Sequence, residues 1–209
     1  MATMLITGGR GGLGHGVVEA ARADGWTVLA PTSAELDLRS AVAVDAYATT
    51  LPDDLRAVVH LVGGIRAGSP VDMTPHDDVV AMFDLNVMTT FHIVSATMAR
   101  LRSNRGCIVT IGARDVLHPQ SNRAAYASSK AAVVTLTQVL AEEGRPDGVR
   151  ANCIVPSIIR TEANLEWADP ATAELMVTPE QIAATIVDLC RPSCAVSGAV
   201  IPMYGGIPY

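Results

Sequence analysis

The sequence has 209 residues, of which 49% are hydrophobic and 17% are charged, and its formal net charge is −6. This composition predicts one globular domain, residues 1–209, because a disordered chain would be more polar and more highly charged. The basic residues are scattered, and no stretch approaches the roughly 18 apolar residues of a membrane span, so we expect a cytoplasmic protein that binds neither nucleic acid nor a membrane.

The first part of the chain predicts two strands that are each followed by a helix. Residues 4–7, MLIT, form a short apolar run, and residues 13–25 place their apolar side chains on one side of a helix. A second apolar run, WTVLA at 26–30, is the next predicted strand. Ser40 is a favourable N-cap for a helix over residues 40–51.

The middle of the chain predicts the centre of the sheet and its longest helices. Residues 57–62, AVVHLV, are apolar nearly throughout, as expected for a strand that is buried on both faces. Residues 74–102 predict one long helix that Thr74 caps. The run CIVTI at 107–111 is the next strand, and apolar positions at helical spacing predict a helix over 124–143.

The last part predicts two closing strands, at 150–156 and 199–204, with a helix between them that starts at a capping box of Thr178 and Gln181. We expect residues 162–176 to form a short lid. Because strands and helices alternate throughout, the predicted fold is α/β: a Rossmann-type doubly wound parallel sheet, with helices on both faces, in a single domain.

Metal chemistry is not expected from the sequence. Its four cysteines show neither the paired spacing of a zinc site nor the density of a disulfide scaffold. Its five histidines do not form the helical pair, with a glutamate between them, that binds zinc in metalloproteases. We therefore predict no metal site and free, buried thiols.

A glycine-rich turn, TGGRGGLG at residues 7–14, connects the first strand to the first helix. At such a turn, backbone amides and the helix dipole can bind a pyrophosphate. Two spacings fit: G-x-G-x-x-G from Gly9, Gly11 and Gly14, or T-G-x-x-x-G-x-G from Gly8, Gly12 and Gly14. A tight turn that binds nothing also uses glycine, but five glycines within seven residues exceed what one turn requires.

Tyr126 and Lys130 are four residues apart, which places them on one face of the helix predicted there. A phenol with a pKa near 10 is a poor acid or base at neutral pH unless its ionised form is stabilised. A neighbouring ammonium favours the phenolate, and the positive ring of an oxidised nicotinamide would add to the effect. The alternative is a surface pair of the kind that many helices carry.

The glycine turn, Asn86 in the predicted long helix and the Y-x-x-x-K motif together resemble the short-chain dehydrogenase/reductase family. LDL at 36–38 is similar to the adenine-contacting Asp-Val pair of that family, and PSIIRT at 156–161 is similar to its P-G-x-x-x-T segment. The resemblance implies an NAD(P)(H)-dependent oxidoreductase that transfers hydride between nicotinamide and a carbonyl or alcohol substrate. It also implies a homodimer or homotetramer built on the two longest helices.

The resemblance assigns Tyr126 as the general acid/base, Lys130 as its activator and a ligand of the nicotinamide ribose, and Asn86 as support for a relay water. Thr161 would lie against the nicotinamide or phosphate end of the cofactor. The implied cofactor-binding residues are Gly8, Arg10, Gly11, Gly12, Leu13, Gly14, Asp37, Leu38, Gly63, Gly64, Tyr126, Lys130, Pro156 and Thr161.

The sequence departs from the family pattern at Ala113, where a serine usually helps to hold the substrate oxygen. Arg114, His118 or Ser121 could supply the missing donor, the substrate could do without one, or catalysis could be lost. The last case would leave a non-catalytic dinucleotide-binding sensor or interaction module. LVGG at 61–64 stands where N-N-A-G is usual, which removes side-chain hydrogen bonds that steady the central strand.

A narrower resemblance concerns the dihydropteridine reductases, which also lack that serine. The segments GGRGGLG, VGG and IGA are similar to theirs. A reductase of quinonoid pterins is therefore an alternative function.

The choice of dinucleotide depends on the end of the second strand, where a carboxylate selects NAD and a basic residue accommodates the phosphate of NADP. Thr32 and Ser33 occupy this end, and the nearest acid is Glu35. Arg10 could reach the phosphate from the glycine turn. NADP(H) is therefore favoured over NAD(H).

Overall fold

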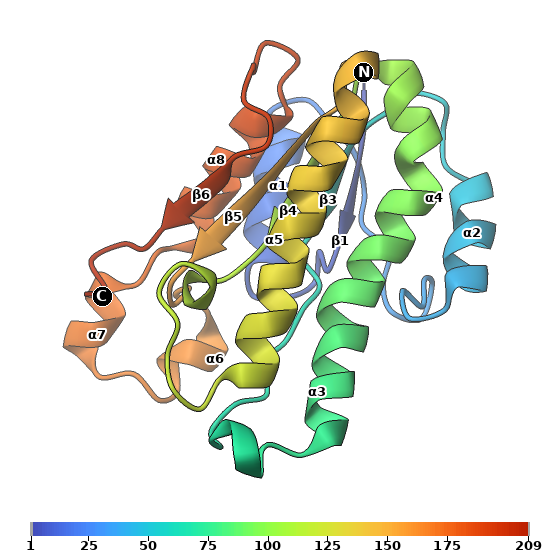
Figure 1. The fold of residues 1–209 in the computed structure, drawn as a ribbon. Coiled ribbons are helices and arrows are strands. Elements are labelled where there is room, and N and C mark those ends of the chain that lie inside the picture. The colour runs from blue at the N-terminus through green and yellow to red at the C-terminus, as the bar shows by residue number, and fades with distance from the viewer. Residues whose placement is uncertain (1, 209) are drawn as a thin grey trace.

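A computed structural model, which describes residues 2–208, contains one sheet of six parallel strands in the order β2-β1-β3-β4-β5-β6 (Figure 1). The predicted doubly wound α/β fold is confirmed. The strands are β1 (Thr3–Thr7), β2 (Thr27–Leu29), β3 (Leu55–His60), β4 (Cys107–Ile111), β5 (Arg150–Pro156) and β6 (Val200–Met203). Strands β4 and β5 have the bounds that their apolar runs predicted.

Helices cover both faces of the sheet (Figure 1). One face carries α1 (Gly14–Ala23) and α8 (Pro179–Cys190), and the other carries α2 (Ala41–Thr49), α4 (Thr89–Asn104) and α5 (Ala124–Gly144). Successive residues of a strand point to opposite faces. In β1, accordingly, Ile6 packs under α1 and α8, whereas Leu5 packs under α2, α4 and α5.

Two of the three predicted helix caps are confirmed. Ser40 accepts a hydrogen bond from the Ala43 amide at 3.2 Å, and Thr178 and Gln181 form the capping box of α8. The predicted Thr74 cap is wrong. Its hydroxyl donates to the Pro70 carbonyl at 2.9 Å and therefore turns away from the helix that follows.

The predicted long helix is interrupted. It consists of α3 (His76–Met82), a π-helical segment (Phe83–Met88) and α4. Asn86, expected within regular helix, lies in the π-helical segment and is 1% exposed. An inserted π turn is frequent at functional sites, because it rotates a side chain out of the regular helical repeat.

This helical run, from His76 to Asn104, passes the length and composition test for a membrane span, with a mean hydropathy of 1.4. The sequence analysis had predicted no stretch long and apolar enough to span a membrane. A single helix of this kind is weak evidence, and this one packs on the sheet through Ile93 and Leu101, which are fully buried. Its apolar composition is thereby explained, in part, as the covering of one sheet face.

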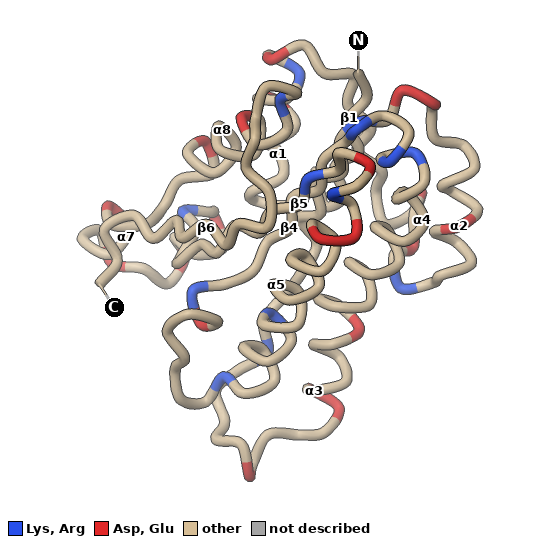
Figure 2. The backbone as a smooth tube through the Cα atoms, turned by 45° about the horizontal axis from the view of Figure 1, so that its top comes forward, with Lys and Arg blue, Asp and Glu red and all other residues tan. Residues whose placement is uncertain are grey.

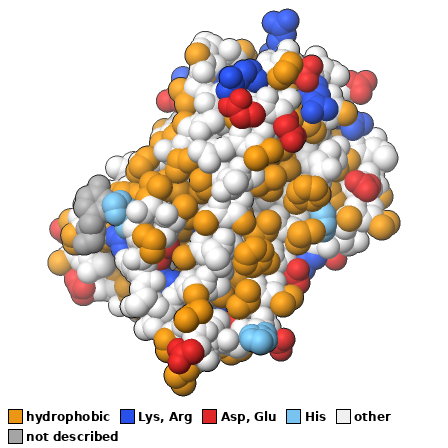
Figure 3. Space-filling model, viewed as in Figure 1, with side chains coloured by type: hydrophobic (Ala, Val, Ile, Leu, Met, Phe, Trp, Pro, Cys, Tyr) orange, Lys and Arg blue, Asp and Glu red, His pale blue; other side chains and the backbone are white. Residues whose placement is uncertain are grey.

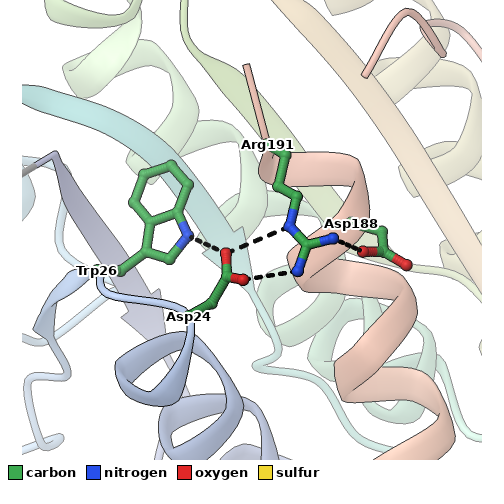
Figure 4. A network of polar contacts seen from close by, with 4 residues as sticks. All are labelled: Asp24, Trp26, Asp188 and Arg191. Carbon is green, nitrogen blue, oxygen red and sulfur yellow. Dashed lines mark hydrogen bonds and ion pairs between the residues drawn. The ribbon is translucent and has the colours of Figure 1, made fainter. Parts of the chain in front are cut away.

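Helices α1 and α8, which share one face of the sheet, are joined at one end by an ionic network (Figure 4). Arg191, directly after α8, forms ion pairs with Asp24 and Asp188, each at 2.6 Å. Trp26 donates its indole hydrogen to Asp24 at 3.3 Å. The network therefore fixes the end of α1 against the end of α8, far from the carboxyl ends of the strands.

Basic residues are distributed over several loops and helix ends of the described chain, with no stripe along one element (Figure 2). Of the 15 basic residues in the sequence, Lys130 is the only lysine. It is 6% exposed, so the fold buries the single ε-amine of the chain.

Candidate active site

Three cavities line the edge of the sheet where the strands have their carboxyl ends. The chain leaves β1 toward α1 on one face and leaves β3 toward α4 on the other, so β1 and β3 define a topological switch point. Open α/β sheets bind ligands at such points. We call the cavities, in order along this edge, the first cavity, the central cavity and the outer cavity, with volumes of about 620, 240 and 360 Å³.

The glycine turn forms one wall of the first cavity. Gly8 has a positive φ of 78°, and the Gly11 amide donates to its carbonyl at 3.0 Å. A Cβ added to Gly14 would lie 2.2 Å from the same carbonyl oxygen, so the start of α1 touches the turn. Backbone alone fills this corner, which fits the close approach that a pyrophosphate at a helix N-terminus requires.

The loop after β2 forms the opposite wall of this cavity, with Asp37, Leu38 and Arg10 around it. Glu35, the acid that follows β2 most closely in the sequence, does not line the cavity and accepts a hydrogen bond from the Thr32 amide at 2.7 Å. Hydrogen bonds from Thr32, with a smaller effect of Arg10, lower the pKa of the Glu35 carboxyl. Asp37 is the acid in the cavity wall, and its Oδ1 accepts from the Arg39 amide at 3.0 Å.

Asn86 and Lys130 meet above Gly63 at the central cavity. A Cβ added to Gly63 would lie 2.8 Å from Asn86 Oδ1 and 2.9 Å from Lys130 Nζ, so any larger residue there would displace these two groups. Asn86 accepts from the Gly64 amide at 2.9 Å and donates to Ser129 Oγ at 3.0 Å. It thereby ties the loop after β3 to helix α5.

Lys130 projects from α5 to the end of β4, where Nζ donates to the Ile111 carbonyl at 2.8 Å. Tyr126 lies one turn earlier on α5 and lines both the central and the outer cavity. The two side chains that the sequence singled out are therefore on one wall of the same site.

The electrostatics of this pair differ from the sequence expectation. Burial is the largest cause that raises the pKa of Tyr126 to about 12, Asp115 adds to it and Arg123 opposes it. Burial also lowers the pKa of Lys130 to about 8. The expectation that the residues of the chain make the Tyr126 phenol more acidic is wrong, because desolvation of the phenolate outweighs the attraction of nearby positive charge.

His60 is a buried residue at this site that the motifs did not identify. Its Nδ1 is 2.7 Å from Thr7 Oγ1, and its Nε2 is 3.1 Å from Thr89 Oγ1, which connects β1, β3 and α4. Burial, with a smaller effect of Lys130, lowers the pKa of His60 to about 3, so the ring is neutral at physiological pH. This network steadies the central strand where the LVGG segment lacks polar side chains.

The outer cavity contains one of the predicted substrate-side positions beside Ala113, namely Arg114, whose Nη1 donates to the Pro208 carbonyl at 2.8 Å. His118 and Ser121 do not line it, and the His118 ring packs on the Tyr204 ring with centroids 5.8 Å apart. Asn164 and Trp167, which also line this cavity, belong to the segment 162–176 predicted as a lid. Ile65, Asp115 and Arg123 escaped the sequence analysis because no motif includes them.

Most of the predicted cofactor-binding positions come together along the first two cavities. The first cavity includes Gly8, Arg10, Gly11, Asp37 and Leu38, and the central cavity includes Leu13, Gly63, Gly64, Tyr126, Lys130 and Pro156. Gly12, Gly14 and Thr161 line neither. Thr161 packs on the glycine turn, since a Cβ at Gly12 would lie 2.7 Å from its Cγ2.

The fold and this edge define a dinucleotide-binding α/β protein. The family model described as short chain dehydrogenase matches residues 32–172, more than half of the chain. The chain therefore belongs to the short-chain dehydrogenase family, and its expected class, an NAD(P)-dependent oxidoreductase, is confirmed.

Three similar proteins illustrate the relationship. L-xylulose reductase of Bos taurus is 28% identical over 97% of this chain and 94% of that protein. Galactitol 2-dehydrogenase of Rhizobium johnstonii is 31% identical over 81% of this chain and 73% of that protein. The solved structure of ElxO with NADP bound has a TM-score of 0.90 at 21% identity, over 98% of each chain. The resemblance to dihydropteridine reductases finds no support in these relatives.

Two glycine-to-alanine substitutions at the start of α1 distinguish the effect of a steric clash from the general effect of alanine on helix stability. Gly14→Ala places a methyl group against the Gly8 carbonyl, and we expect it to lower the free energy of unfolding by at least about 2 kcal/mol and to abolish dinucleotide binding. Gly16→Ala is the matched control in the same helix, because its Cβ would lie 3.5 Å from Pro179, an ordinary contact. Urea unfolding and NADPH titration measure both effects, and wild-type behaviour of Gly14→Ala would contradict this packing argument.

Burial of the Lys130 ammonium lowers the free energy of unfolding by a measurable amount. Since its folded pKa of about 8 lies below the ordinary 10.5, the unfolded chain binds more protons between these pH values, and stability rises with pH across that window. At pH 7 we therefore expect Lys130→Met to be more stable than wild type, by roughly 1–3 kcal/mol in urea unfolding. Tyr126, Cys153 and Cys190 oppose this rise in the upper part of the window, because their pKa values are raised from 10.0, 9.0 and 9.0. The comparison is therefore made at pH 7.

The same pKa can be read directly, because Lys130 gives the only ε-amine resonance in lysine-selective NMR. Its titration midpoint is expected near pH 8. A midpoint near 10.5, or a Lys130→Met variant less stable than wild type, would argue against a costly buried charge.

Proposed function

We propose that the protein is an NADP(H)-dependent carbonyl reductase in which Tyr126 is the general acid and Lys130 positions the nicotinamide ribose. One observation carries this proposal: Tyr126 forms part of both the central cavity, next to Lys130, and the outer cavity. A donor at this junction can reach a substrate oxygen in the outer cavity while the cofactor lies along the first two. The named activities of the two enzyme relatives, a ketose reductase and a polyol dehydrogenase, support a carbonyl or alcohol substrate.

When bound along the first two cavities, the dinucleotide would supply hydride to the carbonyl carbon. Tyr126 donates its phenolic proton to the carbonyl oxygen, and a pKa of about 12 keeps that proton in place at neutral pH, which favours the reductive direction. Lys130 carries its charge below pH 8 and is oriented by the Ile111 carbonyl. Asn86 fixes the loop that carries Gly63 and Gly64, along which the nicotinamide end would pass.

A non-catalytic dinucleotide sensor is the second candidate, and Ala113 is the observation that favours it. Alanine has no side-chain hydroxyl to donate to the substrate oxygen. Removal of one such donor typically lowers kcat by about a hundredfold or more. The sensor would bind dinucleotide in the same cavities without turnover.

Exposed apolar side chains gather over α4 and α5 on the face shown in Figure 3. Among them are Phe91 at 49% exposure and Val139 at 44%. We propose that this face joins copies of the chain into a homodimer or homotetramer. Such an assembly also accounts for the apolar outer side of the helical run that ends in α4.

Turnover distinguishes the two candidates. We expect purified protein to consume NADPH with at least one member of a panel of ketoses and simple ketones, and Tyr126→Phe to lower kcat by about a hundredfold to ten-thousandfold. Tyr47→Phe, in α2 away from the three cavities, is the matched control and should retain wild-type turnover. Dinucleotide binding without turnover of any panel member, unchanged by Ala113→Ser, would instead support the sensor.

The preference for NADP(H) depends on Arg10. We expect Arg10→Ala to weaken NADPH binding about tenfold to hundredfold, because a charged hydrogen bond to phosphate is lost, and to change NADH binding by less than about threefold. Fluorescence titration of both dinucleotides measures this, with Arg22→Ala, at the far end of α1, as the control. Equal losses of affinity for NADPH and NADH would show that Arg10 does not recognise the phosphate of NADPH.

A further inference from the structure

Two large apolar side chains that line the outer cavity, Ile65 and Trp167, are exposed to solvent. Their exposed fractions are 54% and 60%, and neither belongs to a hydrophobic cluster of the described chain. Exposed apolar surface in the wall of a concave site is typical of a place where a ligand binds. These two side chains form an apolar wall that the protein itself leaves uncovered.

The two side chains reach the cavity from segments far apart in the sequence. Ile65 follows Gly64 in the loop after β3 and lines the central cavity as well, as Tyr126 does. Trp167 follows α6 (Glu162–Leu165) and lines the outer cavity but not the central one. The apolar wall therefore begins on the side of the proposed proton donor and extends away from the nicotinamide end.

The indole of Trp167 is held by its polar edge. Its Nε1 donates to Asn164 Oδ1 at 3.3 Å, and Asn164 Nδ2 donates to the Ile159 carbonyl at 2.8 Å. Within the described residues, Trp167 makes no ring-to-ring contact. The faces of the indole therefore remain available for stacking on a flat ligand, which is the arrangement that aromatic pairs favour.

The charged side chains of the outer cavity, in contrast, have partners within the chain. Arg114 donates to the Pro208 carbonyl at 2.8 Å, and Arg123 pairs with Asp115 at 3.4 Å. The apolar wall has no comparable partner among the described residues. This contrast favours a ligand with an aromatic ring over a polyhydroxylated one, whose polar groups would lose water against the wall.

We propose that Ile65 and Trp167 form an apolar subsite for an aromatic ring of the substrate, so that the preferred substrates are aryl-substituted ketones. This inference rests on the proposed function and narrows its substrate class. It differs from the ketose and the polyol of the two enzyme relatives. Hydride from NADPH adds to the carbonyl carbon, and the Tyr126 proton adds to the oxygen. The products are a secondary alcohol and NADP⁺, and solvent returns a proton to Tyr126.

Three ketones test the inference on the wild-type protein. Benzylacetone is butanone with a phenyl ring on its terminal carbon, and its para-carboxylate derivative adds a negative charge to that ring. In NADPH consumption assays we expect kcat/KM to be about tenfold to hundredfold higher for benzylacetone than for butanone, the effect of burying one aromatic ring. The carboxylate derivative and the ketoses of the panel should be poorer substrates than benzylacetone.

Substitutions assign this preference to the subsite. Trp167→Ala should reduce the ratio of the two kcat/KM values to within about threefold of unity, whereas Trp167→Phe keeps an aromatic face and should retain at least about a third of the ratio. Ile65→Ala should lower the ratio by about threefold to tenfold. Val42→Ala, which shortens an 80% exposed side chain of α2, is the matched control and should keep the wild-type ratio.

Fluorescence provides a readout that needs no turnover. The other tryptophan of the chain, Trp26, is 9% exposed and packs in the core, so a change in an exposed indole reports Trp167. Hydrocinnamamide is the amide analogue of benzylacetone and is not reduced by hydride. In the presence of NADP⁺ it should shift the emission maximum to shorter wavelength, whereas propanamide should not. Trp167→Phe should abolish the shift.

The outcomes separate the inference from the proposed function. Equal turnover of benzylacetone and butanone, faster turnover of the carboxylate derivative or of a ketose, or an unchanged ratio in Trp167→Ala overturns the inference and leaves the reductase in place. A missing emission shift with hydrocinnamamide also overturns the inference. Absence of turnover with these ketones and with the whole panel overturns both.

Discussion

The contact between the Lys130 ammonium and the Ile111 carbonyl is the interaction on which the rest of the site depends. It joins helix α5, which covers one face of the sheet, to the end of β4. It also brings Nζ next to Asn86 above Gly63. A charge buried this deeply is unfavourable unless it is hydrogen-bonded, so the surrounding backbone must supply acceptors in fixed positions. The parallel sheet does so, because its carboxyl ends present carbonyl groups along one edge.

Two buried titratable groups near this charge are neutral at physiological pH. His60 is a neutral imidazole between two threonine hydroxyls, and Tyr126 keeps its proton through burial and the nearby Asp115. A buried ammonium close to a neutral phenol suits the proposed reaction, in which a carbonyl oxygen gains negative charge as hydride arrives, since a compensating charge and a proton are already in position. Burial of the Lys130 ammonium lowers the stability of the folded protein at this site, and such a loss is common at functional sites.

The sequence predicted the parts of the molecule that depend on local chemistry. Strands β4 and β5, the capping box at Thr178 and the glycine turn follow from residues close together in the chain. The π-helical turn at Asn86 could not be predicted, because it depends on how the helix packs against α5 and the loop after β3. His60 and Asp115 were missed for a similar reason: each acquires its role from partners on other elements.

The scarcity of lysine has a consequence for the chemistry of the surface. The chain's only ε-amine is 6% exposed and lines the central cavity, so the folded protein offers a side-chain amine only to reagents small enough to enter that cavity. Larger acylating agents and lysine-modifying enzymes reach Lys130 only when α5 moves away from the strand edge. Covalent labelling by such a bulky reagent is thus a reporter of local opening in the molecule.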